Sequence, residues 1–275
     1  MSFNIAGKTA IITGAANGIG LSIARHFADH GANVVCADMD EAGLLDQWGP
    51  NPDEDSDEAG NTRIFAGDLR EKLTIANLLS ATIDAFERVD ILVNASRQVT
   101  LADPLDVDDK SVTSLLDQNL MTSLRLSQLV AKRMILQGEE LDEEDDETPL
   151  GAIVNLSSIA ATRTQPGLMA YSIASAAVDQ MTRSLAVALA PNRIRVNAVS
   201  FGSLMSASLR NTIREHPETR QDIIEGTPLG RIAPAADITE AVQFLVSEAS
   251  SFMTGQIVQV DGGRSLLDVV GNPAH

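Results

Sequence analysis

The stretch Lys8-Thr-Ala-Ile-Ile-Thr-Gly-Ala-Ala-Asn-Gly-Ile-Gly20 begins with an apolar run and ends in three closely spaced glycines. Ala10, Ile11 and Ile12 suit a strand that is covered on both faces. After the glycines, apolar residues recur at helical spacing over 19–28. A strand, a glycine turn and a helix N-terminus in this order place free backbone N–H groups around one point. The stretch therefore predicts a pyrophosphate site, and three glycines that only shape a tight turn are the alternative.

A second apolar run, residues 33–38, ends in the carboxylate of Asp38, 18 residues after Gly20. A carboxylate at this distance accepts hydrogen bonds from an adenosine ribose and repels a 2′-phosphate. No Lys or Arg adjoins Asp38, and Asn17 in the glycine turn is uncharged. The pattern favours NAD over NADP as the bound dinucleotide. A solvated carboxylate at a strand end is the alternative.

Strands and helices alternate along the whole chain, which is typical of a parallel sheet with helices on both faces. We expect strands near 8–13, 33–38, 62–67, 89–94, 151–157, 194–199 and 256–260, and helices near 18–30, 41–47, 71–87, 110–137, 171–190, 206–215 and 237–248. The fold class is therefore α/β, a doubly wound parallel sheet of about seven strands in a single domain over residues 1–275. We also expect acidic loops near 49–60 and 138–149 and a substrate lid near 203–230.

Composition limits the classes of partner and compartment. A formal net charge of −18 argues against binding to nucleic acid or to an anionic membrane. The sequence has no long apolar run and no secretory signal, so we expect neither a transmembrane helix nor export. Its single cysteine, Cys36, forms no intramolecular disulfide, which suits the cytoplasm. The scattered histidines give no metal-ligand pattern, and we expect no metal site.

The predicted helices 110–137 and 171–190 are rich in apolar residues nearly all round. One face of a sheet cannot cover such helices completely. We therefore expect them to form the interface of a homodimer or homotetramer. Burial under a lid within one chain is the alternative.

A second group of polar residues follows the predicted strand 151–157. This strand runs into Ser158, and Tyr171, the only tyrosine, stands at the start of the next helix. Ligands of open α/β sheets bind at the carboxyl ends of the strands. There, the serine hydroxyl could polarise a carbonyl oxygen and the phenol could protonate it as a general acid. Helix capping by the serine and packing by the tyrosine are the alternative.

These motifs, in this order, resemble the classical short-chain dehydrogenases/reductases over nearly the whole chain. Residues 13–20 match the family's cofactor motif, and residues 194–199 and 254–263 look like its late strands. The resemblance implies a Rossmann-type fold and hydride transfer between a nicotinamide cofactor and a small carbonyl or alcohol. The catalytic residues that it implies are Asn119, Ser158 and Tyr171. The cofactor-binding residues that we expect are Gly14, Asn17, Gly18, Ile19, Gly20, Asp38, Asp68, Leu69, Asn94, Gly202, Leu204 and Ser206.

The chain departs from the family pattern around the nicotinamide. Ser175 stands where the family has a lysine that holds the nicotinamide ribose and assists proton transfer. Arg97 and Phe201 also replace family residues, after the fourth and sixth predicted strands. Arg97 or Arg163 could supply the missing positive charge, although an arginine cannot shuttle a proton.

Three functions are compatible with this pattern. The first is an NAD-dependent oxidoreductase with weakened catalysis. The second is a nucleotide-binding pseudoenzyme with a regulatory or assembly role. The third is cofactor-independent chemistry on the same scaffold, as in the halohydrin dehalogenases, and the intact glycine turn ranks it last.

Overall fold

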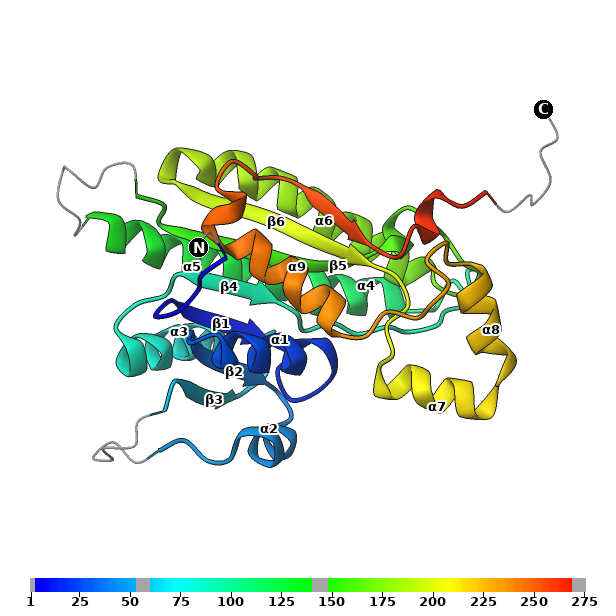
Figure 1. Cartoon of the computed structure of the whole chain (residues 1–275), viewed down its shortest axis with the longest axis horizontal. Helices are drawn as coiled ribbons and strands as arrows, with labels where there is room; N and C mark the ends of the chain where they lie inside the picture. The colour runs from blue at the N-terminus through cyan, green and yellow to red at the C-terminus, as the bar shows by residue number, and fades with distance from the viewer. Residues whose placement is uncertain (1–2, 53–59, 140–147, 269–275) are drawn as a thin grey trace.

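The structure, a computed structural model, describes residues 3–52, 60–139 and 148–268 (Figure 1). Most of the two predicted acidic loops, 49–60 and 138–149, lies outside the described residues, at 53–59 and 140–147. Within the described ranges, seven strands form one parallel sheet in the order β3-β2-β1-β4-β5-β6-β7, which confirms the predicted fold class. The strands are β1 (Thr9–Thr13), β2 (Asn33–Asp38), β3 (Thr62–Ala66), β4 (Ile91–Asn94), β5 (Gly151–Ser158), β6 (Ile194–Phe201) and β7 (Ile257–Val260).

Helices cover both faces of this sheet (Figure 1). On one face α1 (Gly18–Asp29) and α9 (Ala236–Val246) pack against side chains such as Ile12, and on the other α3 (Lys72–Phe86), α5 (Thr122–Glu139) and α6 (Met169–Leu189) pack against side chains such as Ile11. Successive residues of a strand point to opposite faces, so both neighbours in β1 are fully buried. This explains the unbroken apolar runs in the sequence.

The predicted helix 110–137 is divided into three pieces. These are α4 (Ser111–Leu115), a π-helical segment (Leu116–Met121) and α5. A π-helical turn holds one residue more than an α-helical turn, and such turns are frequent at functional sites. Hydrophobic periodicity does not report this local change of pitch.

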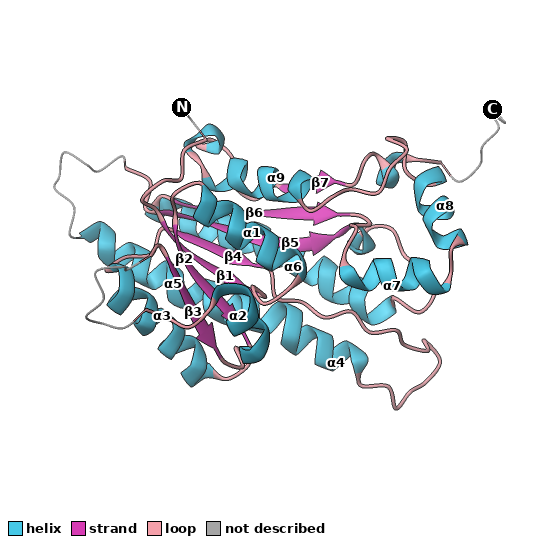
Figure 2. Ribbon diagram, turned by 60° about the horizontal axis from the view of Figure 1, so that its bottom comes forward, coloured by secondary structure: helices cyan, strands magenta, loops and turns pink. Residues whose placement is uncertain are grey.

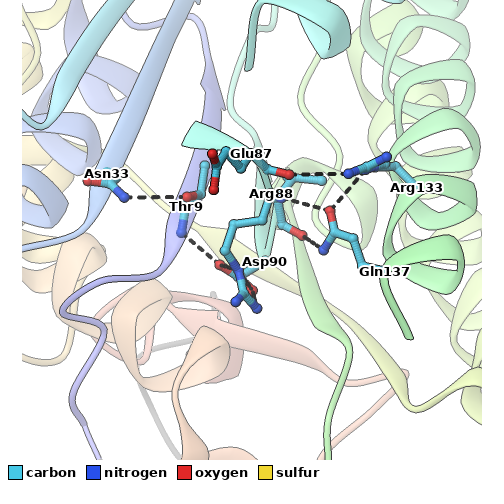
Figure 3. Close-up of polar contacts among 8 residues, drawn as sticks. Thr9, Asn33, Glu87, Arg88, Asp90, Arg133 and Gln137 are labelled. Carbon is cyan, nitrogen blue, oxygen red and sulfur yellow. Dashed lines mark hydrogen bonds and ion pairs between the residues drawn. The ribbon is translucent and has the colours of Figure 1, made fainter. Parts of the chain in front are cut away.

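A polar network fixes β4 at the amino edge of the sheet (Figure 3). Asp90 is 5% exposed and accepts a hydrogen bond from the backbone N–H of Thr9 at 2.8 Å. It also forms an ion pair with Arg88 at 2.6 Å. The Gln137 side chain of α5 both donates to and accepts from the backbone of Val89. These bonds tie β4 to β1 and α5, so they serve the fold at the edge opposite the predicted site.

The carboxyl edge of the sheet faces α7 (Ala207–Glu215) and α8 (Glu218–Glu225), toward which the arrowheads of β5, β6 and β7 point (Figure 2). The Ser206 hydroxyl accepts a hydrogen bond from the Leu209 N–H at 3.1 Å and so caps α7. Both helices lie within the predicted lid, residues 203–230, whose role as a lid stays a prediction. The helix α2 (Glu41–Trp48) connects β2 to β3.

Candidate active site

The glycine turn between β1 and α1 has no room for a side chain at two of its glycines. A Cβ atom on Gly20 would lie 2.1 Å from the carbonyl oxygen of Gly14, and one on Gly14 would lie 2.9 Å from Cα of Ser96. Gly14 and Gly18 also have positive φ, 71° and 59°. Asn17, just before α1, makes no side-chain hydrogen bond to the helix. The N–H groups of the first turn therefore stay available, and the turn fits a pyrophosphate group.

Asp38, at the end of β2, faces the same turn. One of its carboxylate oxygens accepts a hydrogen bond from the N–H of Ala16 at 3.0 Å, and the other accepts one from the N–H of Asp40 at 3.1 Å. The two bonds fix the carboxylate at the rim of the turn. Each oxygen keeps a free lone pair, which suits the hydroxyl groups of a ribose.

A cleft of about 760 Å³ runs along the carboxyl edge of the sheet from this turn to α7. Its volume lies within the usual range for cofactor sites. Nine of the twelve predicted cofactor residues line it, namely Gly14, Asn17, Gly18, Ile19, Gly20, Asp38, Gly202, Leu204 and Ser206. The structure thus brings together residues that stand almost 200 positions apart in the sequence.

The other three predicted cofactor residues do not line this cleft. Asp68 forms an ion pair with Arg70 at 2.6 Å, and the hydrogen bond from that guanidinium lowers the pKa of the Asp68 carboxyl. Leu69 is buried in the core. The Asn94 amide donates a hydrogen bond to Oδ1 of Asn155 at 2.8 Å inside the sheet. Contact of these three with a cofactor stays a prediction.

The cleft also contains residues that the sequence analysis missed. Ser96 and Gln98 follow directly after β4, so their place at the carboxyl edge could have predicted them. Arg210 comes from α7, where its guanidinium donates to the carbonyl oxygen of Met205 at 3.3 Å. No motif or spacing in the sequence points to Arg210.

Arg97 meets the predicted catalytic tyrosine. Its Nη1 donates a hydrogen bond of 2.5 Å to the phenolic oxygen of Tyr171 at the start of α6. The carbon atom of the guanidinium lies 4.2 Å from the ring centre of Phe201, at the end of β6. Arg97 therefore crosses the carboxyl edge from β4 to β6. Phe201 provides the aromatic surface on which this arginine rests.

Ser158 and Tyr171 line a second cavity of about 570 Å³. The Ser158 oxygen accepts a hydrogen bond from the N–H of Ala160 at 3.1 Å. Its hydroxyl hydrogen stays available for a ligand oxygen. Arg163 lines this cavity too, and its guanidinium donates to the carbonyl oxygen of Ser265. Of the two arginines considered as replacements for the lysine, Arg97 is the one bonded to the tyrosine.

Asn119 lies in the π-helical segment and holds the loop that carries Arg97. Its Oδ1 accepts a hydrogen bond from the N–H of Gln98 at 2.8 Å, and its Nδ2 donates to the carbonyl oxygen of Gln98 at 2.9 Å. This two-way contact fixes the backbone next to Arg97. A small cavity of about 10 Å³ beside it is lined by Asn119, Tyr171 and Ser175, a volume close to that of one water probe.

The sequence is similar to known proteins over nearly its whole length. Residues 14–265 match the family model described as "Enoyl-(Acyl carrier protein) reductase". Oxidoreductase UcpA of Escherichia coli O157:H7 is 31% identical over 276 residues, 97% of each chain. The chain belongs to the short-chain dehydrogenase/reductase family. This is a family of oxidoreductases that use a nicotinamide cofactor.

Other similar short-chain dehydrogenases/reductases have more specific names. Galactitol 2-dehydrogenase (L-tagatose-forming) of Cereibacter sphaeroides is 33% identical, with 96% of this chain and 97% of that one covered. A gluconate 5-dehydrogenase from Burkholderia cenocepacia J2315, solved with NADP and tartrate, superimposes with a TM-score of 0.83 at 26% identity. The superposition covers 97% of this chain and 98% of that one.

Among the described residues, no group of three or more His, Cys, Asp and Glu side chains could hold a metal ion. None of the described helices is both long enough and apolar enough to cross a bilayer.

Proposed function

We propose that this protein is an NAD-dependent oxidoreductase that interconverts a carbonyl and an alcohol, with Arg97 in place of the family's active-site lysine. The observation that carries the proposal is the hydrogen bond of 2.5 Å from the Arg97 guanidinium to the Tyr171 hydroxyl. A permanent cation beside the phenol stabilises the negative charge that develops on its oxygen when it gives up a proton. The lysine position, Ser175, faces the small cavity next to that same pair.

The residues of the second cavity supply the proton chemistry. The glycine turn and Asp38 would hold the pyrophosphate and the adenosine ribose of a dinucleotide, whose nicotinamide would supply or accept the hydride. In reduction, the Ser158 hydroxyl donates a hydrogen bond to the carbonyl oxygen and so polarises it. Tyr171 gives its phenolic proton to that oxygen, and Arg97 neutralises the phenolate that remains. In oxidation, the same phenolate takes the proton back from the alcohol.

Because arginine does not release its proton, Tyr171 must regain its own from another group. The cavity of about 10 Å³ between Tyr171, Ser175 and Asn119 lies beside the phenol and has room for about one water molecule. A single water there would be a slower proton source than a lysine ammonium. We therefore expect turnover to be weaker than in relatives that keep the lysine.

The preference for NAD rests on the fixed carboxylate of Asp38, which would repel a 2′-phosphate. We also propose a homodimer or homotetramer built on α5 and α6. Their outward side chains include Leu136, Ile173 and Val187, exposed by 51%, 42% and 78%. Light scattering after size exclusion tests the assembly.

A second candidate is a nucleotide-binding protein without turnover. It is favoured by the position of Arg97, which lines both the cofactor cleft and the second cavity. A hydride has to cross from one space to the other. If Arg97 keeps this place when a dinucleotide is bound, it separates the two reactants.

The test compares the wild type with Tyr171→Phe. Calorimetry measures NADH binding, and the loss of NADH absorbance measures reduction of a panel of ketones and keto acids. We expect equal NADH affinity in both proteins and a rate at least about 100-fold lower in the variant, the usual size of general acid–base catalysis. A wild type that binds no NADH, or a variant that keeps the full rate, would overturn the proposal. NADH binding without turnover by the wild type would support the second candidate.

A further inference from the structure

In the part of the chain that the structure describes, the wall of the second cavity carries three arginines and no carboxylate. Arg97 comes from the loop after β4, Arg163 from the loop after β5 and Arg264 from the segment after β7. The chain as a whole has 38 Asp and Glu against 20 Lys and Arg. A cavity with three cations and no acid is therefore the opposite of what the composition predicts for a random part of the surface.

Among the described residues, the hydrogen-bond partners of these three guanidinium groups are neutral oxygens. Arg163 donates to the carbonyl oxygen of Ser265, and Arg264 donates to the Ser203 hydroxyl at 2.6 Å. No carboxylate among residues 3–52, 60–139 and 148–268 lies within ion-pair distance of Arg97, Arg163 or Arg264. A guanidinium has five N–H donors, so each keeps several that are free.

Arginines elsewhere in the chain do find acids. Three of them form ion pairs of 2.6 Å with aspartates, namely Arg70 with Asp68, Arg88 with Asp90 and Arg231 with Asp237. In a chain of net charge −18, counter-ions are abundant. Other arginines of the described residues, such as Arg63 and Arg195, also donate to neutral oxygens. The particular feature of this wall is that three arginines without an acidic partner lie on one cavity.

The acid closest to these arginines along the chain is already occupied. The Asp261 carboxylate accepts hydrogen bonds from the N–H groups of Gly263 and Ser265, at 2.9 Å and 2.8 Å. Burial alone would raise the pKa of Asp261, but the hydrogen bonds from Ser265 and Gly263 lower it. Asp261 thus holds the turn that presents Arg264 and the Ser265 carbonyl oxygen, and it does not neutralise the wall.

We infer that the substrate of this site carries an anionic group, a carboxylate or a phosphate, bound by Arg163 and Arg264 while its carbonyl faces Ser158 and Tyr171. The inference rests on the proposed function, because it uses the same cavity. Arginine binds planar or tetrahedral anions through two parallel N–H donors, and such bonds are stronger than neutral ones. An anion would also relieve the repulsion among the three cations. A cavity of about 570 Å³ accommodates a small molecule of this kind.

The experiment uses pairs of probes that differ in charge. One pair is 4-oxopentanoate and its methyl ester, and the other is dihydroxyacetone phosphate and dihydroxyacetone. kcat/KM is measured with NADH for the wild type, Arg163→Gln, Arg264→Gln and the control Arg25→Gln. Arg25 is exposed on α1, lines neither the cofactor cleft nor the second cavity and carries the same charge. The two pairs also separate a carboxylate site from a phosphate site.

We expect the wild type to prefer at least one anionic probe over its neutral partner by about 10- to 100-fold, the size of one or two charge-assisted hydrogen bonds. Arg163→Gln and Arg264→Gln should reduce that preference about tenfold each through KM, and Arg25→Gln should leave it unchanged. Equal use of charged and neutral probes by an active wild type would overturn the inference and leave the proposed function standing.

A second measurement does not depend on turnover. Calorimetry follows 4-oxopentanoate and dihydroxyacetone phosphate binding to the protein with and without NAD⁺, conditions in which a ketone is not reduced. Binding that the two cavity variants weaken and Arg25→Gln does not would support the anion site even if every rate were zero. No binding of either anion by the wild type would overturn it.

Discussion

Replacing Arg97 by glutamine would remove the guanidinium that donates to the Tyr171 hydroxyl at 2.5 Å and leave a neutral amide of similar shape. A hydrogen bond to a charged group contributes about 1.5–3 kcal/mol. Each 1.36 kcal/mol of lost transition-state stabilisation lowers a rate about tenfold. If the phenolate develops fully in the transition state, Arg97→Gln should lower kcat by about 10- to 150-fold in both reaction directions.

The assay measures initial rates from NADH absorbance, with NADH affinity and thermal unfolding measured on the same samples. Arg97→Lys keeps the charge but loses the flat contact with Phe201, whose ring centre is 4.2 Å from the guanidinium carbon. It should keep more activity than Arg97→Gln. Ser175→Lys alone would put a second cation beside the cavity of about 10 Å³ and should not help. The double variant Arg97→Gln/Ser175→Lys should recover activity relative to Arg97→Gln.

The opposite result would refute this reasoning. If Arg97 acts only as a barrier between the cofactor cleft and the second cavity, Arg97→Gln would raise kcat. An unchanged kcat would show that the contact with Tyr171 has no part in the rate-limiting step.

Three further predictions concern the fold and the cofactor. Gly20→Ala should destabilise the protein by at least about 3 kcal/mol in denaturant unfolding, because its Cβ would lie 2.1 Å from the Gly14 oxygen. A Cβ on Gly18 would meet open space, but the φ of 59° disfavours other residues, so Gly18→Ala should cost about 1–2 kcal/mol. Asp38→Asn should shift the ratio of NADP to NAD affinity about tenfold toward NADP by calorimetry, and an unchanged ratio would contradict the assignment of NAD. Burial raises the pKa of Asp179, so the folded state keeps the carboxyl proton to a higher pH than the unfolded chain does. The free energy of unfolding should therefore fall as the pH rises from the pKa of the unfolded state to that of the folded state. Asp179→Asn should therefore raise the free energy of unfolding at neutral pH by about 1 kcal/mol, which is measured as a higher melting temperature. The gain should vanish at acid pH.

The fold could be predicted from the sequence because its strands are buried on both faces. A strand such as β5, predicted at 151–157 and observed at Gly151–Ser158, leaves an apolar run that periodicity detects. Helix α8 was missed, since one of its eight residues, Ile223, is buried and the others give no apolar stripe. The π-helical segment was missed because its extra residue does not disturb the apolar pattern around it.

The candidate site could be predicted in part. Short motifs placed the glycine turn and Asp38, because each lies directly at the end of a strand. The sequence could not show whether Arg97 or Arg163 contacts Tyr171, because the path of each loop decides which side chain reaches the phenol. The bond between Arg97 and Tyr171 joins residues 74 positions apart, and the contact of Asn119 with Gln98 fixes that path.

The π-helical turn at Leu116–Met121 makes activity easy to lose without losing the fold. Deleting one residue from this turn would restore regular α-helical hydrogen bonds and keep the flanking helices in nearly the same orientation, because a π turn takes up its extra residue by its wider pitch. Asn119 would then leave the backbone of Gln98, and the loop that presents Arg97 would lose its anchor. The loss of a single codon should therefore leave the fold intact and remove the support of the contact between Arg97 and Tyr171.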